Sequence, residues 1–134
     1  MIEFQAVIGS IQLKRLAQWT ARRTANAKIL ETAAAEKSVF RVPRIPAGLT
    51  HAFYKYYIFV KPETLKESWS RDRIIHEINL RGVPCYQGTC PEVYLEKSFD
   101  NSPSKPKNRL PVARELGETS LMFLVHPTLT EGEI

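Results

Sequence analysis

Cysteine is scarce in this sequence, which contains only Cys85 and Cys90. Small secreted domains that are held together by disulfides need several cysteines, so a disulfide scaffold is excluded. A structural zinc site needs a further Cys or His pair at zinc-ligand spacing, and no such pair accompanies these two thiols. We therefore expect two reduced thiols and no metal site.

Long hydrophobic runs are also lacking. The longest, residues 56–60 and 121–125, are far shorter than the roughly 20 apolar residues that a membrane-spanning helix needs. The first residues include Glu3 and lack the basic segment that opens a secretory leader. These absences predict a cytoplasmic protein with no membrane span.

No block of one charge sign is present either, although the net charge is +5. Lysines and arginines are spread along the chain with acidic residues between them, whereas a nucleic-acid-binding face needs a basic stripe with aromatic side chains that stack on bases. Residues 51–57 combine aromatics with one lysine, but their alternation equally suits a β-strand. We expect no nucleic-acid partner, and an acidic small molecule such as a nucleotide sugar suits this charge.

What the sequence contains is the composition of one globular domain, with 43% hydrophobic and 25% charged residues in 134. Residues 2–36 are predicted to form a helix, because apolar residues such as Phe4 and Ile8 recur at spacings of three and four. This helix would be about 50 Å long, whereas a compact domain of this size has a radius of gyration of about 14 Å. It should therefore break near Gly9 and Ser10 or project, and a projecting apolar end needs a cover, either another part of the protein or a second copy.

Short strands and helices are predicted for the remainder. We expect strands over residues 39–42, 52–60, 83–87 and 120–125, helices over 71–81 and 110–117, one or two helical turns over 91–99, and a polar loop over 100–109. Ser70 should cap the helix over 71–81, Gly82 should end it, and Gly117 should end the next helix. The pattern predicts an α+β domain of two layers, in which helices cover a small, mostly antiparallel sheet.

Both ends of the sequence resemble internal positions of a longer protein. Met1 leads directly into the helical pattern without an N-cap residue, and residues 130–133 have the Thr-x-x-Glu pattern of a capping box with no helix after it. We therefore expect a piece of a larger protein, part of whose function lies in the remainder.

Motifs in order along the chain resemble the DegT/DnrJ/StrS family of sugar aminotransferases. The stretch after the family's Gly-x-Asn-x-Arg loop is matched by Met1, Glu3, Gln5, Ala6, Gly9, Gln12, Leu13, Arg22, Arg23, Asn26 and Ala27. The run HAFYKYYIFVKPE is similar to the family's Tyr-Tyr strand, and the Arg-Asp helix with IIHEINLRGVPCYQGTCPEVYLEKSF resembles the segment that follows it. ARELGETSLMFLVHPTLT resembles the closing segment, so the match covers nearly the whole chain.

This resemblance implies a fold-type I enzyme that depends on pyridoxal 5′-phosphate (PLP) and transfers an amino group, usually from glutamate, to a nucleotide-linked keto-sugar. Residues 1–134 would be the C-terminal small domain, with residues 1–36 as a connecting helix and residues 37–134 as the body. The Schiff-base lysine would precede Met1 in a large domain. We therefore expect no catalytic residue, no bound cofactor and no activity in this chain alone, and a homodimeric parent.

The resemblance also points to the turn after the third predicted strand as the part that approaches the nucleotide sugar. Family members carry a His-Tyr pair there, whereas this sequence has Cys85, Tyr86, Gln87 and Gly88. We expect the Tyr86 hydroxyl and the Gln87 amide to contact a sugar or phosphate oxygen, and Tyr94 to be a further substrate contact.

Five other polar residues were weighed against structural roles. Lys97 shares a predicted helical turn with Tyr94 and could reach the ligand. We expect core or surface roles for His51 and Lys55, a structural role for His126 because it has no nearby nucleophile, and an exposed position for His76.

Two other functions stay open at this stage. Some relatives of this fold have a histidine in place of the lysine and dehydrate a sugar, and the residue that would discriminate lies outside these residues. A non-catalytic binding or dimer-interface module is the other alternative.

Overall fold

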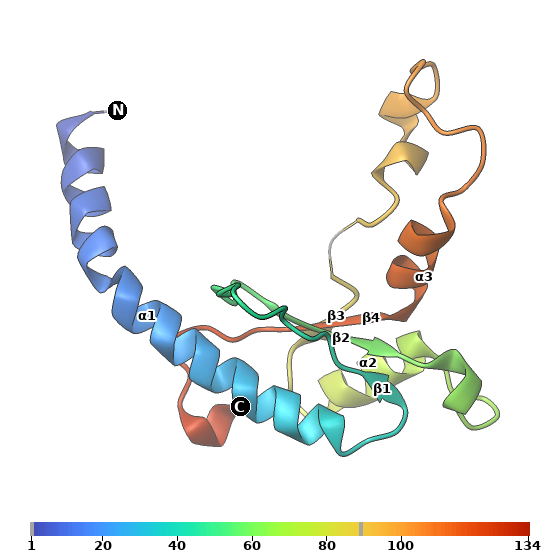
Figure 1. Cartoon of the computed structure of the whole chain (residues 1–134), viewed down its shortest axis with the longest axis horizontal. Coiled ribbons are helices and arrows are strands. Elements are labelled where there is room, and N and C mark those ends of the chain that lie inside the picture. Colours follow the sequence, from blue (N-terminus) through green and yellow to red (C-terminus); the bar gives the residue numbers. More distant parts are fainter. Residues whose placement is uncertain (1, 89) are drawn as a thin grey trace.

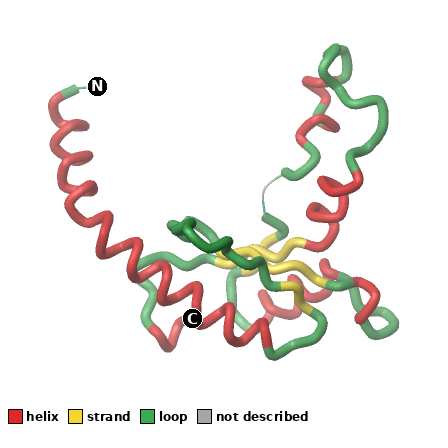
Figure 2. The backbone as a smooth tube through the Cα atoms, viewed as in Figure 1, coloured by secondary structure: helices red, strands yellow, loops and turns green. Residues whose placement is uncertain are grey.

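The computed structural model describes residues 2–88 and 90–134 as an α+β domain, as predicted. The main elements are α1 (Glu3–Ala35), β1 (Phe40–Arg41), β2 (Tyr56–Val60), α2 (Arg71–Leu80), β3 (Cys85–Tyr86), α3 (Pro111–Thr119) and β4 (Ser120–Phe123). Short 3-10 turns occupy Pro62–Thr64, Val93–Leu95, Lys97–Phe99 and Glu131–Glu133. Figure 1 shows α1 and α2 beneath the sheet, and Figure 2 shows how short the strands are.

The four strands form one sheet in the order β1-β2-β4-β3, and all three pairings are antiparallel. The central pair sets Ile58 opposite Leu121 and Tyr57 opposite Met122. β2 begins four residues later than predicted because Phe53 has a left-handed backbone with φ of 46° and donates its N–H to His51 Nδ1 at 2.9 Å. This local turn replaces the extended backbone that the aromatic alternation favoured.

One face of the sheet carries the core. Tyr56, Ile58 and Val60 alternate along β2 as buried residues and pack with Ala27 of α1 and Ile74 of α2. The intervening β2 residues are only half-buried, so the opposite face is the open one. The predicted two-layer arrangement of helices on a small sheet is therefore confirmed.

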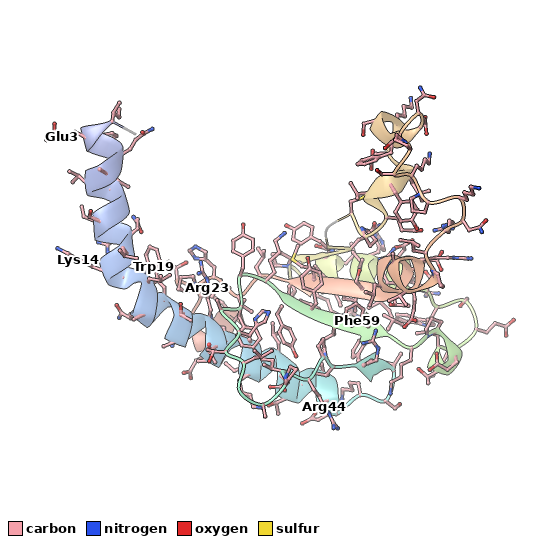
Figure 3. The ribbon with its side chains drawn as sticks, turned by 45° about the horizontal axis from the view of Figure 1, so that its top comes forward. Glu3, Lys14, Trp19, Arg23, Arg44 and Phe59 are labelled. Carbon is pink, nitrogen blue, oxygen red and sulfur yellow. The ribbon has the colours of Figure 1, made fainter. Side chains whose placement is uncertain are left out.

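The first half of α1 projects from the domain instead of breaking. The helix runs unbroken through Gly9 and Ser10, and every residue from 2 to 18 is exposed. Figure 3 shows Glu3 and Lys14 on the part of α1 that stands away from the sheet. Its exposed large apolar side chains are Phe4, Val7, Ile8, Ile11, Leu13 and Leu16, and we call these residues without Leu13 the α1 stripe.

The ends of α2 follow the prediction, whereas the end of α3 does not. Ser70 Oγ accepts a hydrogen bond from the Arg73 N–H at 3.1 Å, and Gly82 has the left-handed φ of 81° that suits a residue just past a helix end. Gly117 was predicted to end its helix, but α3 continues to Thr119. Position 117 requires a residue without a side chain, because a Cβ atom there would lie 2.5 Å from Pro91 Cγ.

The two thiols differ sharply in accessibility. Cys85 is 1% exposed, and burial raises the pKa of its thiol to about 11, whereas Cys90 is exposed. Because the thiolate is the reactive form, Cys85 should stay inert at mildly alkaline pH. We expect one thiol to react quickly with a chromogenic disulfide reagent in the native chain and two after unfolding. Cys90→Ser should remove the fast reaction, and two equally fast thiols in the native chain would contradict this assignment.

In the described part of the chain, no helix is long and apolar enough to cross a membrane.

Candidate functional site

Tyr86 and Gln87 lie at the end of β3, on the sheet edge next to β4. Antiparallel pairing places Tyr86 opposite Met122, which is itself opposite Tyr57, so these three side chains share one face of the sheet. This is the face opposite the core, and we call it the open face because Tyr57 and Tyr86 are partly exposed there, although Met122 is itself buried. Tyr86 is 49% exposed and Gln87 is exposed, so both predicted ligand contacts present their polar groups to solvent.

The backbone of this turn is held tightly against the sheet. Ser120 Oγ donates to the Gln87 carbonyl at 2.5 Å, which ties the turn to the start of β4. Gly88 has a left-handed φ of 101°, and a Cβ atom there would lie 2.6 Å from Cε1 of the Tyr57 ring. Only glycine allows this close approach without displacing the ring. We call Tyr86, Gln87 and Gly88 the 86–88 turn.

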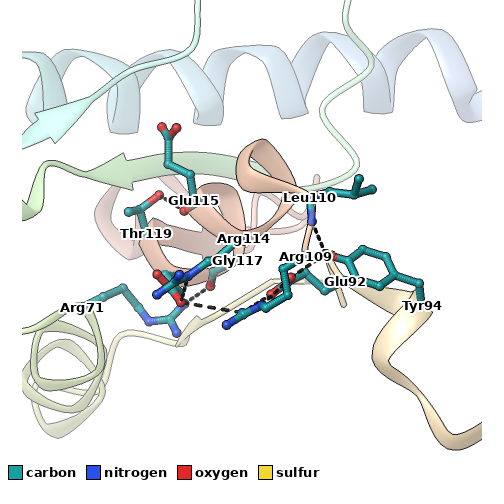
Figure 4. A network of polar contacts seen from close by, with 10 residues as sticks. Arg71, Glu92, Tyr94, Arg109, Leu110, Arg114, Glu115, Gly117 and Thr119 are labelled. Carbon is teal, nitrogen blue, oxygen red and sulfur yellow. Dashed lines mark hydrogen bonds and ion pairs between the residues drawn. The ribbon is translucent and has the colours of Figure 1, made fainter. Parts of the chain in front are cut away.

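A charge network that is partly open to solvent follows the turn (Figure 4): Glu92 and Tyr94 are buried, whereas Arg109 is exposed. Arg109 donates to both carboxylate oxygens of Glu92, from Nε to Oε1 at 3.0 Å and from Nη2 to Oε2 at 2.5 Å. The Tyr94 hydroxyl donates to Glu92 Oε1 at 2.6 Å and accepts from the Leu110 N–H at 2.9 Å. We call Glu92, Tyr94 and Arg109 the Glu92 clamp.

The clamp is charged at neutral pH. The Arg109 hydrogen bond, together with that from Tyr94, lowers the pKa of Glu92 to about 2. Burial and the hydrogen bond to Glu92 raise the pKa of Tyr94, so its hydroxyl keeps its proton. Tyr94 is buried with both hydrogen bonds in use, and its predicted contact with substrate stays a prediction.

A second arginine supports the same region from the opposite side. Arg71 Nη1 donates to the carbonyl oxygens of Gly117 at 3.0 Å and of Ser120 at 3.2 Å. These carbonyls lie at the C-terminal end of α3, where a cation is favoured by the helix dipole. Arg71 therefore fixes the junction of α3 and β4 on which the 86–88 turn is anchored.

Sequence reasoning missed the partnership of Glu92 with Arg109 and the role of Arg71. The clamp partners are 17 residues apart, and Arg71 is 46 residues from Gly117. No periodicity connects positions at such separations, so only the tertiary structure brings them together.

The other candidate residues do not form a catalytic arrangement with one another. Each is exposed, lines a small cavity or contacts only its neighbours in the chain. Lys97 and His76 are exposed, and His51 accepts the backbone hydrogen bond of a local turn. Lys55 lines a small cavity at the start of β2. His126 Nδ1 lies 2.7 Å from Thr128 Oγ1, which is a turn contact. Among residues 2–88 and 90–134 no cluster of three metal-ligating side chains exists.

The cofactor lysine of a Schiff base needs a desolvated environment to be reactive, and none of the lysines in the described ranges is buried. Glu92, the most buried carboxylate among the described residues, is paired with Arg109.

Solved structures similar to this chain are aminotransferases that are about three times as long. The chain is similar, with 57% identity and a TM-score of 0.94, to an aminotransferase from Psychrobacter cryohalolentis, over 99% of this chain and 36% of that one. It is also similar to the aminotransferase TlmJ from Streptoalloteichus hindustanus, with 25% identity and a TM-score of 0.79, over 94% of this chain and 31% of that one. The chain thus spans about a third of the length of these solved structures.

A further structure, a sugar aminotransferase named Spr1654 from Streptococcus pneumoniae, shares the fold at 20% identity and a TM-score of 0.79, with 99% of this chain and 32% of that chain covered. A comparison with curated proteins finds no significant match. The family model of the DegT/DnrJ/EryC1/StrS aminotransferases matches residues 1–134. The chain therefore belongs to the DegT/DnrJ/EryC1/StrS aminotransferase family.

Proposed function

We propose that this chain is the C-terminal small domain of a homodimeric, PLP-dependent enzyme that transfers an amino group from glutamate to a nucleotide-linked keto-sugar. The observation that carries the proposal is the family match over residues 1–134 in a chain that spans about a third of a solved aminotransferase. In this proposal the PLP lysine lies in the large domain of the same protein. A cytoplasmic location stays a prediction.

In this proposal, the role of the small domain is to bind and orient the sugar nucleotide. Tyr86 and Gln87 are both exposed at the end of β3, and Tyr86 lies on the face opposite the core. A hydroxyl and an amide can both donate to and accept from the hydroxyls of a sugar, and both can donate to a phosphate oxygen. The 86–88 turn is tied to β4 and to Tyr57, so these two groups are presented by a fixed backbone.

The α1 stripe supports a large domain as the partner of this chain. Its residues recur along one helix over more than three turns, and all are exposed although they are apolar. Exposed apolar surfaces of this kind mark protein interfaces. The proposed occupant is the large domain, against which the first half of α1 would pack.

The reaction class is tested with the full-length protein. Addition of PLP should produce the visible absorption of a lysine-bound cofactor, and addition of glutamate alone should convert this absorption to that of the aminated cofactor. The isolated chain should give only the spectrum of free PLP. A histidine at the cofactor position, with sugar dehydration and no response to glutamate, would replace this proposal with the dehydratase.

The sugar contacts are tested by substitution in the same protein. Tyr86→Phe and Gln87→Ala each remove one hydrogen bond, so the Kd for a bound nucleotide sugar should rise about three- to tenfold. Tyr54→Phe is the matched control, because Tyr54 is exposed on a different loop and loses the same hydroxyl. Unchanged affinity in both site variants would remove the 86–88 turn from the binding site.

A further inference from the structure

We propose that Glu92, Tyr94 and Arg109 are positioning residues for the nucleotide sugar, because the clamp that they form holds the 86–88 turn in its binding geometry. The inference rests on the proposed function and adds residues to its site. None of the three needs to touch the ligand. Their role is to fix the backbone that presents Tyr86 and Gln87.

The clamp closes a long loop at its base. Glu92 and Arg109 lie at the two ends of residues 93–108, which rise away from the sheet in Figure 1. The ordering of a loop of this length costs conformational entropy, which contacts between its ends must offset. The bidentate ion pair supplies such a contact, and the hydrogen bond from the Leu110 N–H to the Tyr94 hydroxyl supplies another.

Pro91 and Gln87, on the two sides of the gap in the described chain, both contact the junction of α3 and β4. Pro91, the neighbour of Glu92, packs directly on Gly117, at a distance that leaves no room for a Cβ atom. The Gln87 carbonyl is bonded to Ser120. Arg71 in turn fixes the carbonyls of both Gly117 and Ser120. Gln87 and Pro91 are thus both held on the junction of α3 and β4, which Arg71 supports.

Loss of the clamp would free one of these two ends. Without the Glu92 carboxylate, the Arg109 guanidinium and the Tyr94 hydroxyl lose their shared partner, and Pro91 loses the anchor beside it. A displacement of about 1 Å in a binding group is enough to lower its contribution by one to two orders of magnitude. The clamp depends on the planar shape of the Arg109 guanidinium as well as on its charge, because two of its nitrogens donate to the two carboxylate oxygens of Glu92.

The test uses the full-length protein loaded with PLP and two readouts. Calorimetry measures the Kd of UDP-N-acetylglucosamine and of dTDP-glucose, which serve as the nucleotide-sugar probes. Cofactor absorption after addition of glutamate alone measures the half of the reaction that needs no sugar. Glu92→Gln and Arg109→Lys should each weaken probe binding by roughly tenfold or more, while the glutamate response stays within about twofold of wild type. Glu67→Gln, an exposed glutamate on another loop, is the matched control and should change neither readout.

The outcomes separate this inference from the proposed function. Wild-type protein that binds neither probe would overturn the sugar-nucleotide assignment and the inference with it. Wild-type binding together with unchanged binding in Glu92→Gln would overturn only the inference. If Glu92→Gln loses both readouts through misfolding, Tyr94→Phe decides, because it deletes one hydroxyl and keeps the ring. Selective loss of probe binding in Tyr94→Phe supports the clamp, and any other result in that variant contradicts it.

Discussion

Replacement of Leu121 with alanine is expected to lower the free energy of unfolding by about 2–5 kcal/mol. Leu121 is 0% exposed, lies on β4 between β2 and β3, and faces Ile58 in the core. The truncation removes buried methyl groups and leaves a cavity that the paired strands on either side prevent from collapsing. Urea unfolding of the purified chain, followed by far-UV circular dichroism, measures the change.

Leu80→Ala is the matched control for this substitution. Leu80 is 68% exposed at the end of α2, so the same atoms are removed without loss of buried contact. Its effect should stay within about 0.5 kcal/mol. Equal losses in the two variants would show that the sheet is not the stabilising core.

Gly117→Ala is expected to destabilise the domain although alanine is the better helix former. Helix propensity alone would favour alanine by about 1 kcal/mol. The new Cβ atom would lie 2.5 Å from Pro91 Cγ, and neither the proline ring nor the helix backbone can rotate away. Such overpacking costs about 1–3 kcal/mol, so the net change should be a loss of stability in urea unfolding.

Gly9→Ala provides the opposite expectation at a second helical glycine. No heavy atom lies within 4 Å of a Cβ atom built at Gly9, so only the helix propensity acts. The substitution should increase the helical signal of α1 and should not destabilise the chain. A gain of stability in Gly117→Ala similar to that in Gly9→Ala would disprove the close contact with Pro91.

The sequence predicted most elements because their determinants are local. The α2 boundaries follow from a capping serine and a glycine that accepts a left-handed backbone, and both are present at the expected positions. The strands β1 and β3 are two residues each, much shorter than predicted, because strand length depends on the partner strand and not on propensity alone. The helix end predicted at Gly117 was wrong for the same reason, since a packing neighbour explains this glycine.

The candidate site was only partly predictable. The resemblance to a family directed attention to Tyr86 and Gln87, and both are exposed at the end of β3, although their contact with substrate stays a prediction. Tyr94 was predicted to contact substrate from the turn that follows, and the fold uses its hydroxyl inside the Glu92 clamp. Neither the clamp nor the support from Arg71 has a sequence signature, because each joins residues that are distant in the chain.

The sequence by itself indicated the α+β class, the approximate places of the main elements and the family, since helical periodicity, caps and ordered motifs are properties of neighbouring residues. It also predicted a first helix that either breaks near Gly9 and Ser10 or projects with an apolar end, and the structure shows that it projects. The tertiary structure alone decided which glycines are needed for space and which charges pair, because those depend on distances between segments that no local pattern encodes. The contact of the 86–88 turn with β4 and the pairing of Glu92 with Arg109 are both of this kind.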